Sequence, residues 1–246
     1  MNVKDYFSAG SPDYRRFRPG YPAALFDFLA AATPSRRVAL DVATGNGQAA
    51  GEMARHFEFV LAGDSSANQL KEAAAHERVH YVRHTAERLP VRTGAADLVA
   101  VAQAAHWFDF PPFYSEARRV LRPRGIVALW TYSLFRVDSA VDTVVERFYR
   151  ERVGPYWPPE RRYVDNHYRS LPFPLEELPA PEFELSVDWP FEALMSYIGT
   201  WSAVGRCRSA TGVDPAPELA LALSAGWPQG AARSIRFPIH LRIGRV

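Results

Sequence analysis

The residues with the clearest chemical potential lie in one short segment, between Asp41 and Gly47. An acid ends an apolar run, and Gly45 and Gly47 follow it. Glycine lets the backbone turn tightly and lets a ligand lie across the turn without meeting a side chain. A second acid, Asp64, ends the next apolar run, where a carboxylate can accept hydrogen bonds from both hydroxyls of a ribose. The pattern indicates a site for a cofactor that contains a nucleoside.

Two cofactor classes fit this loop when it is taken alone. Gly45-x-Gly47-x-x-Ala50 matches the loose G-x-G-x-x-G/A fingerprint of dinucleotide sites. The run Asp41-x-Ala43-x-Gly45-x-Gly47 instead approaches the acid-x-Gly-x-Gly-x-Gly pattern of S-adenosylmethionine sites. An acid ahead of the loop suits the cationic amino-acid tail of adenosylmethionine and repels a pyrophosphate. Asp41 therefore favours adenosylmethionine, while the glycine turn alone leaves both cofactors, and an ordinary α/β turn, open.

The elements that must position these groups alternate between strands and helices as far as residue 132. Apolar runs predict strands, the longest of them buried on both faces, at 38–41, 57–62, 79–83, 97–102 and 125–130. Amphipathic segments predict helices at 22–32, 48–56, 66–75 and 113–121. This alternation predicts a Rossmann-like α/β fold, with a mostly parallel seven-stranded sheet and helices on both faces.

The second half of the chain is less regular. It predicts helices at 137–153, 191–204 and 217–225, strands at 183–189 and 234–243, and an irregular stretch rich in proline and aromatic residues at 154–181. Pro238 inside the last strand predicts an edge position or a bulge. We expect an N-terminal cap segment at 1–34 and a cofactor-binding core at 35–133. Residues 134–246 would complete the same domain with a substrate cap and the last strands.

Composition narrows the class of protein. The 246 residues are 48% hydrophobic with a formal net charge of +2, and the arginines are scattered among acids, so a nucleic-acid partner is not expected. No apolar run reaches the roughly 20 residues that cross a bilayer, and the N-terminus does not resemble a signal peptide. One cysteine and dispersed histidines predict neither an internal disulfide nor a metal site. We expect a cytoplasmic protein without a membrane partner; its oligomeric state is not readable from the sequence.

Beyond the loop, the chain resembles a known family, the class I adenosylmethionine-dependent methyltransferases of the type 11 group. Within that group it is most similar to the branch of trans-aconitate-type small-molecule methyltransferases. The resemblance covers most of the chain and rests on motifs in a fixed order. They are Tyr14-x-x-Phe17-Arg18-Pro19-x-Tyr21-Pro22, Leu40-Asp41 through Gly47, Ala86-Glu87-x-Leu89-Pro90, Gln103-Ala104-x-His106-Trp107-Phe108-Asp109 and Arg119-Val120-Leu121-x-Pro123-x-Gly125.

The resemblance implies roles for individual residues toward S-adenosyl-L-methionine. Asp41, Ala43, Gly45 and Gly47 would line its methionine end, and Asp64 would hold the ribose. The adenine would be bordered by Ser65, Thr85, Ala86 and Glu87. Gln103 would lie under the sulfonium, and Tyr14 and Arg18 would close over the cofactor from the N-terminal segment.

Two positions depart from the family pattern. Ala43 stands in place of the usual first glycine, and we expect alanine to fit this turn if its φ stays negative. Thr85 stands where many relatives place an aspartate that binds the adenine amino group. Contact with the adenine is therefore expected through backbone atoms or the threonine hydroxyl.

The chemistry needs few groups because the sulfonium already activates the methyl group. The protein must align the acceptor and exclude water, and a base is needed only if the acceptor arrives protonated. His106 is the candidate base, since the natural pKa of histidine lies near neutrality; the alternative is a structural role beside Trp107. The predicted substrate pocket consists of aromatic side chains and this histidine: His106, Trp107, Trp130, Tyr132, Trp157 and Trp201.

The sequence therefore predicts an enzyme that methylates a small molecule, at a carboxylate or hydroxyl group. Two alternatives remain open from the sequence alone. One is a protein that binds adenosylmethionine without catalysis, and the other is an NAD(P)-dependent reductase.

Overall fold

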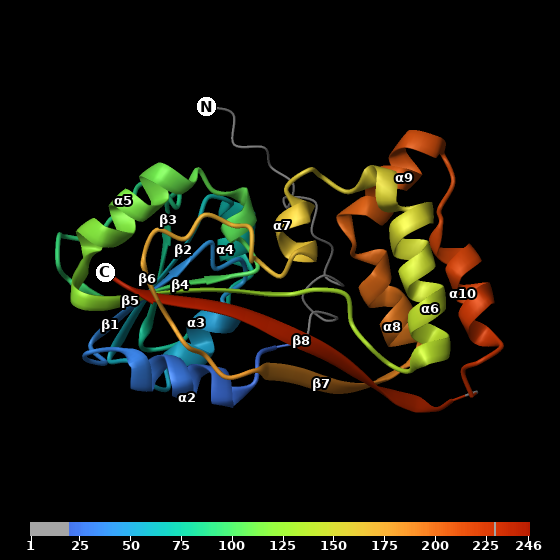
Figure 1. Ribbon diagram of the computed structural model, residues 1–246, viewed down its shortest axis with the longest axis horizontal. Helices are drawn as coiled ribbons and strands as arrows, with labels where there is room; N and C mark the ends of the chain where they lie inside the picture. The colour runs from blue at the N-terminus through green and yellow to red at the C-terminus, as the bar shows by residue number, and fades with distance from the viewer. Residues whose placement is uncertain (1–19, 229) are drawn as a thin grey trace.

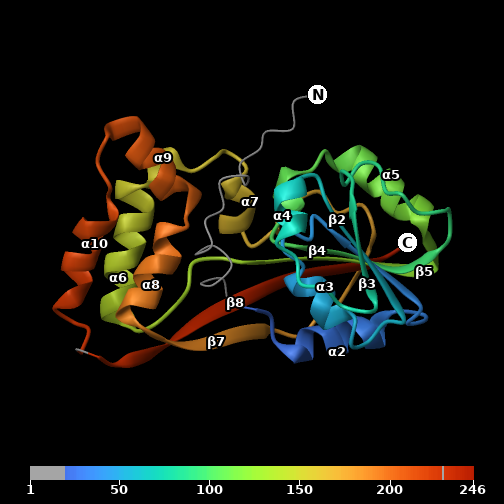
Figure 2. The same cartoon turned by 180° about the vertical axis from the view of Figure 1, so that it is seen from behind.

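Two lobes make up the protein, joined by its longest strand. The computed structural model describes residues 20–228 and 230–246. An α/β lobe and a helical lobe lie at opposite ends of the molecule, and β8 (Ala232–Arg245) runs from one into the other (Figures 1 and 2). Strand β7 (Phe183–Pro190) accompanies β8 on the side of the helical lobe.

The described residues form a mixed eight-stranded sheet. Its path runs β3-β2-β1-β4-β5-β8-β6, and β7 pairs with β8 off this path. Strands β1 to β5 pair in parallel, and β8 is antiparallel to β5, β6 and β7. The bounds are β1 (Val38–Val42), β2 (Phe59–Asp64), β3 (Val79–Arg83), β4 (Ala96–Ala102), β5 (Leu121–Tyr132) and β6 (Glu176–Leu178). The predicted Rossmann-like α/β fold is confirmed, with β6 as an additional strand.

Helices cover both faces of the parallel part of the sheet. The apolar sides of α2 (Ala23–Ala32) and α3 (Gln48–Met53) share one core cluster, and α5 (Phe110–Val120) belongs to the other. The short helix α4 (Ala67–Lys71) follows β2, with the Ser66 hydroxyl accepting from the Gln69 amide. β4 is buried almost throughout, which explains its continuous apolar sequence.

The helical lobe contains α6, α8, α9 and α10. Their bounds are α6 (Ser139–Arg147), α8 (Phe191–Gly199), α9 (Ser202–Thr211) and α10 (Ala216–Ser224). Helix α6 continues as the π-helical segment η2 (Phe148–Arg152) and is followed by the 3-10 turn η3 (Gly154–Tyr156). Helix α7 (Arg161–Asp165) lies between the lobes in both views. One apolar core cluster extends from the sheet into this lobe.

Two predictions for this half need correction. The single helix expected at 191–204 is two helices, because the Thr200 hydroxyl bonds back to the Tyr197 carbonyl (2.6 Å) and Trp201 is extended. The irregular stretch at 154–181 contains η3, α7 and β6. Neither α7 nor β6 is long enough to produce a sequence period.

Pro238 occupies a gap in the ladder on one side of β8. β5 last pairs with β8 at Tyr132 and Ile239, and the next contact on that side is the bridge between Arg136 and Arg236. The Arg236 amide donates to the Arg136 carbonyl (2.8 Å), on the side of β8 that faces β5. Because every second residue of a strand directs its backbone groups to the same side, the nitrogen of Pro238 also faces β5. The proline therefore removes no hydrogen bond to β5, as expected from its exclusion from continuous ladders.

A buried carboxylate, that of Asp97, links three parallel strands where they begin. Asp97, at the start of β4, is fully buried and accepts from the Ser35 hydroxyl (2.7 Å), the Val38 amide (2.9 Å) and the Arg122 guanidinium (2.5 Å). Burial raises the pKa of Asp97, but these donors outweigh it and hold the pKa below its ordinary value. Asp97 thus joins the first residues of β1, β4 and β5.

Replacing Asp97 by asparagine should destabilise the protein by about 3 kcal/mol at pH 7, because charge-assisted bonds are lost and Arg122 keeps a charge without its partner. Since the folded pKa is depressed, the stabilisation by Asp97 is present above the ordinary value of 3.8 and is lost as the pH falls through the folded pKa. Urea unfolding should show the deficit shrinking in acid. Glu77→Gln, at an exposed pair with Arg78, is the control and should cost little. A deficit that does not depend on pH would contradict the role of the charge.

Candidate functional site

The glycine-rich turn between β1 and α3 has a left-handed backbone at alternate residues. Ala43, Gly45 and Gly47 have φ values of 58°, 58° and 85°. The expectation that Ala43 keeps a negative φ is therefore wrong, because the turn needs the conformation of the missing glycine. Backbone bonds hold the turn in place: the Thr44 amide donates to the Gly63 carbonyl (2.9 Å), and the Gly47 amide donates to the Thr44 carbonyl (3.1 Å).

Asp41 lies beneath this turn and is completely buried. Its Oδ2 accepts from the Thr44 hydroxyl (2.5 Å), while Oδ1 has no hydrogen-bond partner among the described atoms. The pKa of Asp41 is raised to about 7, because burial outweighs the lowering effects of the Thr44 hydroxyl and the Ala50 amide and the negative charge of Asp64 adds to it. A buried acceptor without a donor is costly. The orphaned oxygen therefore fits a ligand that brings a cationic donor, such as the ammonium of adenosylmethionine.

Asp64 connects the turn to the end of β2. Its Oδ2 accepts from the Gly45 amide (2.9 Å), and its Oδ1 accepts from the Ser66 amide (2.8 Å). Each carboxylate oxygen has a second lone pair, so these bonds leave capacity for further donors. The neighbouring Ser65 carbonyl accepts from the Arg83 guanidinium (2.9 Å).

Besides its left-handed backbone (φ 85°), Gly47 has a second constraint that the sequence did not show. A Cβ at this position would lie 2.3 Å from the hydroxyl oxygen of Tyr81. The collision is thus with a side chain of β3 and not only with a ligand across the turn. The Tyr81 hydroxyl is itself held by the Ala74 carbonyl (3.0 Å).

The predicted adenine-bordering segment follows β3. The Thr85 carbonyl accepts from the His84 ring (2.9 Å) and from the Arg88 amide (3.3 Å), so this carbonyl is already engaged. Ala86 is buried, and the Glu87 carboxylate accepts from the Asp109 amide (3.2 Å). The segment is thereby joined to the loop that leads into α5. The predicted contacts of Tyr14 and Arg18 lie outside the described residues.

The ends of β4 and β5 are joined through Gln103. Its backbone is left-handed (φ 56°), and its amide donates to the Trp130 carbonyl (2.9 Å). Its side-chain oxygen accepts from the Thr131 hydroxyl (2.8 Å). Three residues later, His106 lies in the 3-10 turn η1 (Ala105–Trp107) and is buried. This arrangement places an imidazole and an amide at the carboxyl edge of the parallel sheet, where α/β folds bind ligands.

Tyr168 is the functional candidate that sequence reasoning missed. It is fully buried, and its hydroxyl lies 2.9 Å from Nδ1 of His106. Burial raises the pKa of Tyr168 above its ordinary value. The two residues are 62 positions apart, and Tyr168 falls in the stretch expected to be irregular, so no local pattern pointed to their contact.

The predicted pocket residues do not gather in one place. Trp107 packs on His106, with ring centroids 4.7 Å apart. Trp130 and Tyr132 belong to the core cluster on the other face of the sheet, and Trp130 is fully buried against Phe26. Trp157 and Trp201 pack against each other and against Tyr149 in the helical lobe. Most of these aromatics therefore serve core packing.

A cavity of about 380 Å³ adjoins the Tyr168 turn. Its lining includes His167 and His240, whose rings stack with centroids 3.7 Å apart, and the charged side chains of Arg169 and Glu182. Burial, together with the smaller effects of the neighbouring His167 and Arg169, lowers the pKa of His240 to about 4. This imidazole is therefore uncharged at neutral pH.

Two broader observations concern the part of the chain that the structure describes. No group of three side chains of the metal-ligating types is gathered there. No helix there combines the length and the apolar character that crossing a membrane requires.

Replacing Ala43 by glycine should stabilise the protein. A left-handed backbone costs an L-residue roughly 1–2 kcal/mol, and the greater freedom of glycine in the unfolded chain returns about 0.4–1 kcal/mol of this. We expect a higher urea midpoint, equivalent to roughly 0.5–1 kcal/mol. Ala50→Gly in α3 is the matched control and should have the opposite sign. Equal losses in both variants would show that Ala43 is not strained.

Comparisons of the sequence and the structure with known proteins find methyltransferases. The family described as a methyltransferase domain matches residues 40–129. A candidate methyltransferase of Dictyostelium discoideum is 30% identical over 249 residues, which cover 98% of this chain and 95% of the relative. A candidate type II methyltransferase from Anaeromyxobacter dehalogenans has a solved structure with a TM-score of 0.88 and 44% identity, over 93% of this chain and 97% of that one.

A more distant structure shares the fold alone. It is a candidate methyltransferase from an antibiotic biosynthesis pathway of Anabaena variabilis, 17% identical with a TM-score of 0.57 over 91% of this chain and 98% of that one. The near relatives decide between the two cofactors that the glycine turn left open, while the trans-aconitate-type branch stays a prediction. The chain therefore belongs to the adenosylmethionine-dependent methyltransferases, with adenosylmethionine as its cofactor.

Proposed function

We propose that this enzyme transfers the methyl group to a small-molecule acceptor, at a carboxylate or hydroxyl oxygen, beside the carboxyl ends of β4 and β5. The observation that carries the proposal is the buried His106, held against Tyr168 next to Gln103. The N-cap of the following helix, Asp109, is bonded to Glu87, so this loop is fixed from both sides.

The residues at the glycine-rich turn fit the cofactor in a defined order. Asp41 would pair with the ammonium, since its Oδ1 lacks a donor. Asp64 would accept from the ribose hydroxyls, Ser65 and the segment 85–87 would border the adenine, and Gln103 would lie beneath the sulfonium. When bound, adenosylmethionine supplies a methyl group that its sulfonium has already activated.

The part played by His106 depends on the acceptor. A carboxylate attacks without losing a proton, whereas a hydroxyl must lose one. In both cases the residues around His106 must align the reacting oxygen and exclude water. The modest net charge of +2 and the absence of a basic run in the sequence support a small acceptor over a nucleic acid.

The function is tested by incubating the purified chain with adenosylmethionine and panels of small carboxylic acids, phenols and alcohols, and measuring adenosylhomocysteine. We expect turnover with a subset of these compounds. His106→Ala should lower turnover of the best acceptor at least about tenfold at saturation, while His76→Ala, at an exposed histidine, should not change it. Near-normal turnover of the His106 variant would remove His106 from the chemistry. Methylation of a protein or nucleic acid only would overturn the small-molecule proposal.

Replacing Asp41 by asparagine should raise the stability of the unliganded protein and weaken the binding of the cofactor. Without ligand, folded Asp41 keeps its proton up to about pH 7, while unfolded Asp41 loses it near its ordinary pKa of 3.8. The free energy of unfolding of the wild type therefore falls as the pH rises between these values. The asparagine variant carries no charge at any pH. We expect it to be more stable than the wild type at pH 8 by roughly 1–3 kcal/mol, with no difference near pH 4.

The same variant should bind adenosylmethionine at least about tenfold more weakly at pH 8, because an amide does not pair with an ammonium. Urea unfolding measures the first effect and calorimetry the second. Asp188→Asn, at an exposed position in β7, is the control and should alter neither. Unchanged affinity would remove Asp41 from the cofactor site.

A further inference from the structure

The contact between Tyr168 and His106 determines which ring nitrogen of the histidine carries its proton. Among the described residues, Nδ1 of His106 is the hydrogen-bond partner of the Tyr168 hydroxyl, at 2.9 Å. Tyr168 is fully buried, and burial raises its pKa, against the smaller lowering effects of the Thr131 hydroxyl and nearby backbone amides. The phenol of Tyr168 therefore keeps its proton at neutral pH.

A buried hydroxyl proton needs an acceptor. The neighbouring Thr131 hydroxyl directs its own proton to the side-chain oxygen of Gln103 (2.8 Å). The lone pair at Nδ1 of a neutral imidazole is an acceptor, and it lies at hydrogen-bond distance. A proton on Nδ1 would instead make the Tyr168 hydroxyl the acceptor and turn its own proton toward the Thr131 oxygen. The structure gives this hydroxyl a direct hydrogen bond to Nδ1, at 2.9 Å, and none to Thr131 among the described residues, which favours donation from Tyr168 to Nδ1.

We infer that Tyr168 is a positioning residue that holds neutral His106 in the tautomer with its proton on Nε2. At Nε2 the ring then carries an N–H donor. It does not offer the lone pair that a general base needs. This role rests on the proposed function. It gives His106 a role in which no proton leaves or enters its ring during methyl transfer, and so favours the carboxylate acceptor of that proposal, which attacks without losing a proton.

The backbone at Tyr168 is strained, and several contacts hold it. His167 and Tyr168 are consecutive left-handed residues, with φ values of 55° and 60°. The Tyr168 amide donates to the Tyr163 carbonyl (2.7 Å). Strained residues persist only where the surroundings fix them and are common at functional sites. The turn is therefore built to place this side chain.

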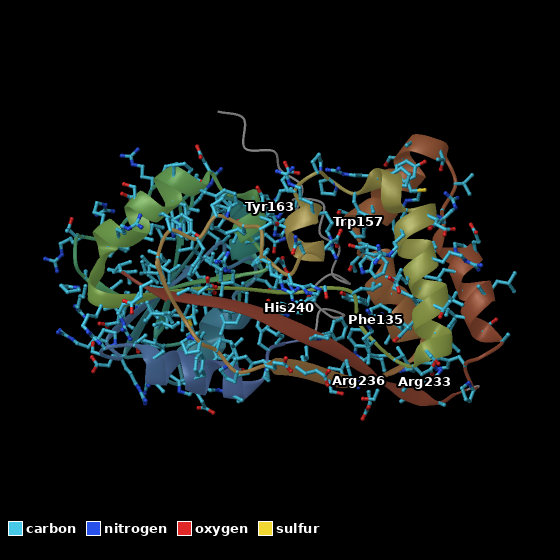
Figure 3. The ribbon with its side chains drawn as sticks, viewed as in Figure 1. Phe135, Trp157, Tyr163, Arg233, Arg236 and His240 are labelled. Carbon is cyan, nitrogen blue, oxygen red and sulfur yellow. The ribbon has the colours of Figure 1, made fainter. Side chains whose placement is uncertain are left out.

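Strand β8 supplies the main anchor of the turn. Arg242 donates to the carbonyls of Tyr168 (3.2 Å) and Leu171 (2.7 Å). Both oxygens of Glu177, in β6, hold the same guanidinium at 2.8 and 2.7 Å. His240, two residues earlier in β8, lies below α7 in Figure 3. The ion pair between Arg242 of β8 and Glu177 of β6 thus supports the position of His106 indirectly, through the backbone and the hydroxyl of Tyr168.

The test is the ¹⁵N spectrum of the full chain labelled at histidine, recorded without ligand between pH 7 and 9. The His106 resonances are assigned as those missing from His106→Gln. We expect a protonated Nε2 and an unprotonated Nδ1 with the shift of a nitrogen that accepts a hydrogen bond. Tyr168→Phe should remove that hydrogen-bond shift at Nδ1.

Tyr114→Phe is the matched control. Tyr114 is also buried, and its hydroxyl donates to the Pro172 carbonyl (2.6 Å) and not to His106. We expect it to leave the His106 resonances unchanged, although it too loses a buried hydrogen bond. A general structural effect would instead move the His106 resonances in both variants.

A proton on Nδ1 in the wild type would overturn the inference, and so would an Nδ1 shift that Tyr168→Phe leaves unchanged. If Tyr168→Phe does not fold, the wild-type spectrum alone decides. The measurement uses no acceptor. Failure of every compound in the acceptor panel would therefore count against the proposed function and would leave the tautomer result standing.

Discussion

Strand β8 is the constraint on which the rest of the structure depends. It pairs first with β7 and then with β5 and β6, and so belongs to both lobes. Its Phe237 contacts Tyr132 of the sheet and Tyr197 of α8, with centroids 5.3 and 5.4 Å apart. Because one strand carries both contacts, the helical lobe cannot shift far without disturbing the sheet. The continuity of the apolar core across the lobes follows from this pairing.

The same strand reaches the candidate site from the side opposite to the glycine-rich turn. Left-handed backbone occurs at Ala43 after β1, at Gln103 after β4 and at Tyr168 after α7. Each of these residues lies where the chain leaves a regular element beside the carboxyl edge of the sheet. The conformational cost is offset by bonds from elsewhere, such as those of Arg242 to the Tyr168 turn. The site is thus assembled from strained junctions that a rigid sheet supports.

Much of this organisation could be predicted because it depends on residues that lie close together in the sequence. The apolar runs of the strands and the acid followed by glycines each lie within a few residues, so the fold class and the place of Asp41 and Asp64 followed from the sequence. The contact of Tyr168 with His106 could not, because it depends on how β6 and β8 hold a distant turn. The φ of Ala43 was misjudged because side-chain size was weighed without the backbone that the turn imposes. The pocket role of Trp130 and Trp201 stays a prediction, since both side chains also pack in the core.

The proton on Asp41 has a consequence for the catalytic cycle. Burial raises the pKa of Asp41 to about 7, so without ligand this carboxyl keeps its proton to a much higher pH than an ordinary aspartic acid does. Under the proposed pairing of Asp41 with the cofactor ammonium, the ionised carboxylate is favoured, so loading of the cofactor would expel the proton into solution. Substrate and product cofactor bear the same ammonium. Proton release would therefore accompany entry and uptake would accompany exit, while methyl transfer itself leaves Asp41 unaltered. At lower pH, protons would then compete with the cofactor for Asp41 in the unliganded enzyme and so slow cofactor binding.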